Sequence, residues 1–482
     1  MTPAGKYETT IGLEVHVQLA TQSKIFCGCS TRFGSSPNSQ ACPVCLGFPG
    51  ALPVMNKEAL GFAIKVGVAL GCEIAGRMKF DRKHYYYPDL PKNFQISQYD
   101  LPLAAEGSLE LFGDGQRRVI RIKRVHLEED AGKLIHAEKG DASLVDFNRS
   151  GMPLLEVVSE PDITSPEEAY EYLTEVKSIL RYLDVSDCNM EEGSLRCDAN
   201  ISIRKTGAKS LGVKTELKNM NTFRGVKIAL QYEIDRQKAV LEEGGKIIQE
   251  TRLWNEAKAR TFLMRTKEEA FDYRYFPEPD LVPFLIDRET VESIKASLPE
   301  LPQKRYERFV ENYKLQPALA SIIVNERDLA DFFEESAKGY PRNVQLIANW
   351  ITGDIQGELN KRKLSMASLG LKPEAFADML KLIDEGVITG KIAKGLLVDM
   401  IETGSMPREL VKSLGLSQIT DKGALEAVME KVIKNNPKPV EDYKNGKTNV
   451  ITFLVGQVMR ETKGKANPKI INEMLRERMG KL

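Results

Sequence analysis

Alternating hydrophobic and polar residues predict β-strands in the first part of the chain. In residues 11–19 (IGLEVHVQL), hydrophobic side chains alternate with polar ones that include Glu14 and His16. Residues 195–204 (LRCDANISIR) and 213–218 (VKTELK) repeat this two-residue period. Because successive side chains of a strand point to opposite faces, each strand has one apolar face and one polar face. Polar faces that neither a helix nor apolar residues cover would form a polar cleft.

Helical patterns interrupt these strands twice and then dominate the chain after about residue 295. Residues 165–168 (SPEE) are typical of a capping box with proline at the first helical position. A second helix is predicted from about Thr222 to the glycine pair that begins at Gly244. Beyond residue 295, apolar residues recur at three- and four-residue spacing in polar segments separated by Pro and Gly. This pattern indicates a helical array.

These patterns predict an α+β fold followed by helical domains. We place an α+β domain at residues 1–294, an all-helical domain at residues 295–405 and a small helical tail at residues 406–482. A chain of 482 residues is too long for one ordinary hydrophobic core, which also favours several domains.

The composition is that of a folded soluble protein. Hydrophobic residues make up 42% of the chain and charged residues 28%. The sequence contains no run of about 18 apolar residues and no N-terminal signal pattern, which excludes a transmembrane helix and a secretory signal. Seven cysteines are few and odd in number for this length. They argue against a disulfide framework and favour a reducing cytosol, so we expect a cytoplasmic protein without a membrane partner.

Basic and acidic residues balance over the whole chain but not within its parts. With 68 of each, the formal net charge is zero, which argues against a surface devoted entirely to nucleic acid. Residues 406–482 nevertheless carry a net charge of +6, and the rest of the chain carries −6. A basic tail could make salt-dependent phosphate contacts that do not read sequence. A solvated, lysine-rich helical module is the alternative.

Four of the cysteines form two closely spaced pairs. Cys27 and Cys29 are followed, after twelve residues, by Cys42 and Cys45, and Gly47 comes soon after the second pair. Two such pairs separated by a loop suit four thiolates that converge on zinc. Four sulfur ligands leave no open position for water, so such a zinc ion would be structural. Four free thiols are the alternative interpretation.

Acidic residues on the predicted polar faces suggest a second kind of metal site. Carboxylates with at most one imidazole are the ligands that Mg²⁺ or Mn²⁺ prefers. Each acid alone is more typical of a solvated surface, but several strands carry the same arrangement. The candidate ligands are Glu14, His16, Glu128, Glu129, Asp198 and Glu216.

A bound nucleotide would need a site without a glycine-rich loop. Residues 207–215 (GAKSLGVKT) only approach the phosphate-binding loop pattern, because Val213 separates the second glycine from the lysine. Residues 79–100 and 272–280 mix Arg, Lys and Tyr in proline-stiffened loops, which suit phosphate contacts and base stacking. Ordinary loops packed by tyrosines are the alternative.

Long segments of the chain resemble the B-subunit family of bacterial tRNA-dependent amidotransferases, the aspartyl/glutamyl-tRNA(Asn/Gln) amidotransferases. The resemblance extends from about residue 7 to residue 480. It rests on the strings TIGLEVHVQL, FDRKHYYYPDLPKNFQISQYD, RVHLEEDAGK, SLVDFNRSGMPLLEVVSEPD, MEEGSLRCDANISIR, TELKNMNTF, DYRYFPEPD and VEDYKNGK, with FLVGQVM and KGKANP in the tail.

The resemblance implies a fold, a reaction and partners. The fold would be a mainly antiparallel-sheet cradle domain with a zinc-stapled loop, then an all-helical domain and a YqeY-like tail that contacts tRNA. ATP would phosphorylate the side-chain carboxylate of Glu or Asp misacylated on tRNA(Gln) or tRNA(Asn), and ammonia would then displace the phosphate. An amidase, the A subunit, would release that ammonia from glutamine, and a small C subunit would complete the heterotrimer.

The resemblance also implies site residues and cofactors. The same six metal-site residues carry over by motif, with Mg²⁺ or Mn²⁺ and ATP as cofactors and with zinc in the structural site. The motifs leave open which residues hold the nucleotide, and the candidates are Lys83, Arg149, Tyr273 and Arg274. Two other functions stay open at this point. One is a zinc-stapled RNA-binding scaffold without catalysis of its own, and the other is metal-dependent hydrolysis of a phosphoester.

Overall fold

The computed structural model describes residues 6–111, 117–136, 142–266, 273–416, 422–444, 447, 449–462, 466 and 468–480. The chain divides into two compact units, Met1–Pro302 and Gln303–Leu482. Within the described ranges, no helix combines the length and hydrophobicity needed to cross a membrane.

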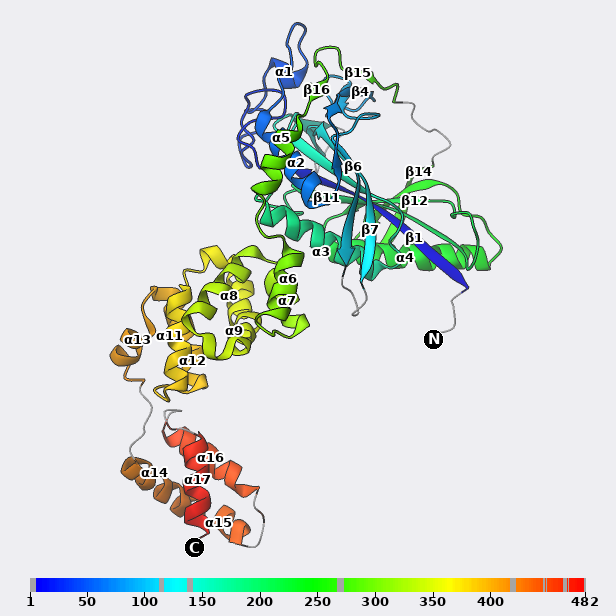
Figure 1. Cartoon of the computed structure of the whole chain (residues 1–482). Coiled ribbons are helices and arrows are strands. Elements are labelled where there is room, and N and C mark those ends of the chain that lie inside the picture. The colour runs from blue at the N-terminus through cyan, green and yellow to red at the C-terminus, as the bar shows by residue number, and fades with distance from the viewer. Residues whose placement is uncertain are drawn as a thin grey trace. The chain divides into compact units, whose positions relative to one another are not determined.

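A nine-stranded sheet forms the centre of the first unit (Figure 1). Its strand order is β14-β13-β12-β11-β1-β10-β7-β6-β2, and every neighbouring pair is antiparallel except β12 and β13. The strands are β1 (Tyr7–Gln18), β2 (Glu73–Ile74), β6 (Ala104–Leu111), β7 (Arg118–Glu129), β10 (Pro153–Ser159), β11 (Leu195–Lys205), β12 (Thr215–Met220), β13 (Glu250–Asn255) and β14 (Arg260–Thr266).

Three smaller sheets accompany the main one. In the first, β4 (Asp81–His84) pairs with β15 (Phe276–Pro277) on one side and with β5 (Phe94–Ser97) on the other. The other two pair β16 (Phe284–Leu285) with β3 (Arg77–Met78), and β8 (Lys133–His136) with β9 (Ser143–Asp146). Strand β5 lies against β7, so the small sheet containing β4 borders the main one. The helices of this unit are α1 (Pro43–Leu46), α2 (Lys57–Ala69), α3 (Pro166–Tyr182), α4 (Phe223–Glu242) and α5 (Arg288–Ala296).

Helices α2, α3 and α4 pack against one face of the main sheet (Figure 1). The apolar side chains of β1, from Ile11 to Val17, are fully buried beneath them. The polar side chains of the same strand therefore lie on the face that these helices do not cover. This is the two-faced strand that the alternating sequence predicts.

The N-cap of α3 differs in detail from the predicted capping box. The Ser165 hydroxyl accepts a hydrogen bond from the Glu168 backbone N–H at 3.1 Å, as expected. The Glu168 carboxylate, however, accepts from the Thr164 N–H rather than from that of Ser165. The predicted start of the helix is therefore confirmed, but the glutamate side chain accepts its hydrogen bond from the residue before the N-cap.

The second unit is helical throughout its described residues, and its helices form two hydrophobic clusters. The elements of the first cluster are α6 (Pro302–Glu311), α7 (Pro317–Val324), α8 (Arg327–Gly339), η2 (Pro341–Asn343), α9 (Val344–Trp350), η3 (Ile351–Ile355), α10 (Gln356–Arg362), η4 (Met366–Ser368), α11 (Pro373–Asp384), α12 (Gly390–Thr403) and α13 (Pro407–Ser413). The second cluster joins α14 (Lys422–Asn435), α15 (Pro437–Lys444), α16 (Val450–Glu461) and α17 (Pro468–Met479). The predicted fold class, a mainly antiparallel-sheet domain followed by helical regions, is confirmed.

Two details bear on the predicted domain boundaries. Ile294, Leu298 and Leu301 still pack against the core of the first unit. Val411 of α13 is buried in the cluster of the helices before it, although it lies in the segment we assigned to the tail. Part of the lysine- and glycine-rich turns of that tail, residues 445, 446, 448, 463–465 and 467, lies outside the described residues.

Candidate functional site

Strand pairing brings acidic residues together on the polar face of the main sheet. In the register of β1, Glu14 lies opposite Asp198 of β11, and His16 lies opposite Glu156 of β10. Facing residues of paired strands have their Cβ atoms about 5 Å apart. Ionisable side chains from distant parts of the sequence are therefore held in contact by backbone hydrogen bonds.

These side chains form two groups that could each hold a metal ion. One group is His16, Glu128 and Glu156, and the other is Glu14, Asp198 and Glu216. Within each group the potential ligand atoms all lie within 4.8 Å of one another. Oxygen donors with one imidazole fit Mg²⁺ or Mn²⁺ rather than zinc.

Histidines supply the positive charge beside the first group. His126 Nε2 lies 3.2 Å from Glu156 Oε2, and His16 Nε2 lies 3.5 Å from the same carboxylate oxygen. Burial lowers the pKa of His126, but Glu156 and Glu128 outweigh it and raise that pKa to about 9. The same pairs hold the pKa of Glu156 well below its usual value against the effect of burial. Two imidazoles thus lie beside the carboxylates of this group.

Neighbouring polar side chains orient the second group. Asn200 Nδ2 donates to Glu14 Oε1 at 2.9 Å, and Thr251 Oγ1 donates to Glu216 Oε2 at 2.7 Å. The Lys218 ammonium pairs with Asp198 and lies 3.3 Å from Glu216 Oε1. Burial and repulsion from Glu156 raise the pKa of Glu14. A divalent cation would relieve this repulsion, so the donor set fits such an ion.

The structure places five of the six predicted ligands in these groups, and it places Glu129 elsewhere. Glu129 Oε2 accepts from Lys92 Nζ at 2.6 Å, and Glu129 Oε1 accepts from the Ile96 N–H at 2.9 Å. Consecutive residues of a strand point to opposite faces, so Glu128 and Glu129 cannot both reach the polar face. The sequence reasoning missed Glu156, although a single Glu within the apolar run PLLEVVS was a usable signal.

The predicted nucleotide-binding residues separate into two environments. The Lys83 ammonium lies 5.1 Å from the centre of the Tyr273 ring, and the charge of Glu128 helps to raise its pKa. Arg149, in contrast, donates to the carbonyl oxygens of Ala131 and Gly132 at 3.0 and 2.6 Å. Arg274 has a left-handed backbone with φ of 44°. Of these residues, the structure brings Lys83 and Tyr273 together.

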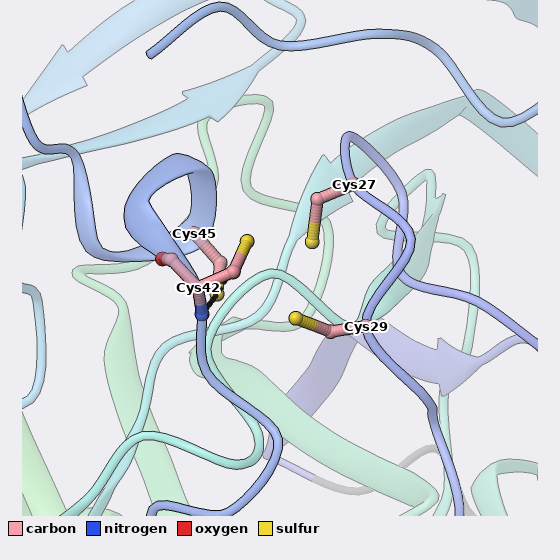
Figure 2. A group of neighbouring side chains, drawn as sticks. All are labelled: Cys27, Cys29, Cys42 and Cys45. Carbon is pink, nitrogen blue, oxygen red and sulfur yellow. Dashed lines mark hydrogen bonds between the residues drawn. The ribbon is translucent and has the colours of Figure 1, made fainter.

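The four clustered cysteines converge as the spacing predicts (Figure 2). Their sulfur atoms all lie within 4.8 Å of one another, which suits tetrahedral coordination of a metal such as zinc. Gly47 ends α1 with φ of 71°, the left-handed turn that its place after the second pair suggests. The fully buried Lys24 ammonium lies 3.7 Å from Cys45 Sγ and donates to the Gln40 carbonyl at 2.7 Å. This ammonium helps to lower the pKa of Cys45, and it would offset negative charge on sulfurs that bind a metal.

Comparison with known families agrees with this architecture. The GatB/GatE catalytic domain family matches residues 9–292, which contain all three side-chain groups. The chain belongs to this family. The GatB domain matches residues 331–479, within the helical unit.

Relatives of this GatB/GatE family member match over its full length. A protein of Carboxydothermus hydrogenoformans is 57% identical over 482 residues, covering 99% of this chain and 100% of the relative. A protein of Caldanaerobacter subterraneus is 55% identical, again over 99% of this chain and all of the relative. A protein of Brevibacillus brevis is 51% identical, with the same coverage. Each is named as the B subunit of an aspartyl/glutamyl-tRNA(Asn/Gln) amidotransferase.

The cysteine site is tested by its metal content. Elemental analysis of protein purified without chelators should find about one zinc ion per chain, because four convergent sulfurs form a closed site. Cys42→Ser should lose most of the zinc and destabilise the loop, whereas Cys72→Ala, at an isolated buried cysteine, should keep it. Wild-type protein with almost no zinc would count against the site.

The carboxylate groups are tested by direct cation binding. Glu156→Gln keeps the shape of a ligand but removes its charge, so Mn²⁺ affinity measured by calorimetry should fall roughly 10–100-fold. Glu160→Gln, just beyond the same strand, is the matched control and should bind Mn²⁺ like the wild type. Equal affinity of both variants would contradict the assignment.

Proposed function

We propose that this chain is the B subunit of a tRNA-dependent amidotransferase and carries its kinase and transamidase site. The observation that carries the proposal is the pair of adjacent three-ligand groups on the polar sheet face. They lie in a chain whose full-length relatives are named as amidotransferase B subunits. The substrates would be Glu-tRNA(Gln), Asp-tRNA(Asn) or both.

The proposed reaction has two steps. A side-chain carboxylate oxygen of the misacylated residue attacks the terminal phosphorus of ATP, and ADP leaves. Ammonia then attacks the activated carbonyl carbon, phosphate leaves, and the amide remains on the tRNA. Divalent cations held by the two groups would neutralise the phosphates and align the attacking oxygen, which is the main requirement of phosphoryl transfer.

The chain's own residues would position these partners. Glu14, His16, Glu128, Asp198 and Glu216 would act as cation ligands, and we add Glu156 to them. His16 would serve as a ligand rather than a base, since the attacking carboxylate has already lost its proton. Lys83 and Tyr273 together offer a cation and a ring for the nucleotide. Glu129 stays a candidate ligand from the resemblance, and Arg149 and Arg274 stay candidates for the nucleotide. The contacts of Glu129 and Arg149 brace neighbouring loops instead.

The remaining parts of the chain would support the reaction. Zinc bound by the cysteines would stabilise the loop next to the site. The relatives' names designate one subunit of several, and we propose that an amidase, the A subunit, supplies the ammonia and that a small C subunit completes the assembly. The basic tail would contact tRNA phosphates in a heterotrimer that works in the cytoplasm. A zinc-stapled RNA-binding scaffold is the competing function.

The kinase step is tested in the assembled enzyme with misacylated tRNA, ATP and glutamine. Glu128→Gln should lower tRNA-stimulated ADP release by about 10²–10³-fold, because it removes charge from the cation group. Glu73→Gln, on the exposed edge strand β2, should leave the rate unchanged. A wild-type enzyme without tRNA-stimulated ADP release would favour the scaffold.

The tail is tested by deleting residues 417–482. The cut follows Leu416 because α13 packs with the helices before it. tRNA affinity should fall, and the slope of affinity against salt concentration should become shallower as phosphate contacts are lost. Association with the other subunits, measured by gel filtration, should persist. Unchanged tRNA affinity would refute the role of the tail.

A further inference from the structure

Arg124 lies on the same sheet face as the carboxylate groups but belongs to neither. Its Cα pairs with that of Val158 on β10, Val158 pairs with Glu14 on β1, and Glu14 pairs with Asp198 on β11. These four residues form one row across the sheet. With neighbouring strands about 4.8 Å apart, the Cα atoms of Arg124 and Glu14 are separated by roughly 10 Å.

A β-bulge turns Arg124 toward this face. Ile120 and Ile122 are buried in the core, and so are Val125 and Leu127. The core-facing positions of β7 thus change from even to odd residue numbers, which a regular strand does not allow. This change occurs at Lys123, which has no partner on β10, because Ile122 and Arg124 pair with consecutive residues of that strand. Such a bulge inserts one residue and re-aims those beyond it. Arg124 therefore shares the polar face with His126 and Glu128.

The guanidinium of Arg124 has no counter-ion among the residues that the structure describes. Its Nε is buried and lacks a hydrogen-bond acceptor there. Other partly buried arginines of the first unit pair closely: Arg82, Arg196 and Arg236 lie 2.6–2.8 Å from carboxylate oxygens. A partly buried charge without a partner is costly, and such positions are typical of functional sites.

The surroundings of Arg124 favour an anion. Burial raises the pKa of the nearby Tyr275 phenol and Glu128 adds to the rise, while Lys83 and Arg124 both oppose it, so two cations act on this phenol. The Lys83 ammonium contacts aromatic rings and likewise has no carboxylate within ion-pair distance in the described part of the chain. Cations without counter-ions beside two cation-binding groups leave room for a ligand that carries several negative charges.

We propose that Arg124 is a catalytic residue that binds an oxyanion of the substrates at the polar sheet face. The planar guanidinium matches two oxygens of a phosphate or carboxylate. The oxyanion is either a phosphate of the nucleotide or the side-chain carboxylate of the aminoacyl group. This inference rests on the proposed function and adds to it a residue that touches the reacting groups.

The experiment compares Arg124→Gln and Arg124→Lys with Lys123→Gln in the assembled enzyme. Lys123 is exposed and adjacent on the same strand, so its variant removes the same charge from a solvated position. Three quantities are measured: tRNA-stimulated ADP release with the KM for ATP and for aminoacyl-tRNA, affinity for a non-hydrolysable ATP analogue with Mn²⁺, and the melting temperature.

We expect Arg124→Gln to slow ADP release by roughly 10²-fold, with Arg124→Lys intermediate and Lys123→Gln unchanged. Binding of a nucleotide phosphate would also weaken ATP-analogue affinity about tenfold, whereas binding of the substrate carboxylate would raise only the KM for aminoacyl-tRNA. The melting temperature should stay the same or rise, because the lost charge has no partner.

Two results would overturn the assignment. One is an Arg124→Gln variant that matches Lys123→Gln in all three quantities. The other is a lowered melting temperature with a proportionate loss of every activity, which would mark a structural role. If the wild-type enzyme itself released no ADP, the proposed function would fall, and ATP-analogue affinity would still decide whether Arg124 contacts the nucleotide.

Discussion

The antiparallel register of β1 with β10 and β11 is the constraint on which the site depends. It places carboxylates of three strands within a few ångströms of one another, an arrangement that their mutual repulsion opposes. Backbone hydrogen bonds and the buried apolar side chains of β1 hold the strands in place. A shift of β1 by one residue would turn Glu14 and His16 toward the core, so burial of the apolar face of β1 fixes the geometry of its polar face.

On the polar face of the main sheet, some charged side chains have partners of opposite charge and others do not. Imidazoles and Lys218 accompany the two acidic groups, and Asn200 and Thr251 orient individual carboxylates through hydrogen bonds. Lys83 and Arg124 are partly buried, and neither has a carboxylate within ion-pair distance among the described residues. The face therefore combines two acidic groups with cations beside them. That combination suits chemistry on phosphate and carboxylate groups.

The segment that carries the four cysteines is linked by a short stretch of chain to the sheet face that carries the two carboxylate groups. Cys45 contacts the loop that precedes β10, because the Ser150 hydroxyl donates to its carbonyl oxygen at 3.3 Å. The N–H of Gly151 in the same loop donates to the Asp130 carbonyl at the end of β7. Ordering of the cysteines thus helps to set the ends of two strands that carry ligands. The four cysteines and the carboxylate face are parts of one folded unit.

Local patterns in the sequence determined the strands β1, β11 and β12, the starts of α3 and α4, and the cysteine cluster. Alternation in β1 and β11 and the spacing of the cysteines depend on neighbours in the chain, and all three agree with the structure. Only the tertiary structure decided which acids meet. Glu129 is adjacent to Glu128 in sequence but lies on the opposite face, and Glu156 joins the group from an apolar strand. The bulge at Lys123 likewise turns Arg124 toward the site. Strand register and bulges arise from pairing between distant segments, and no local period records that pairing.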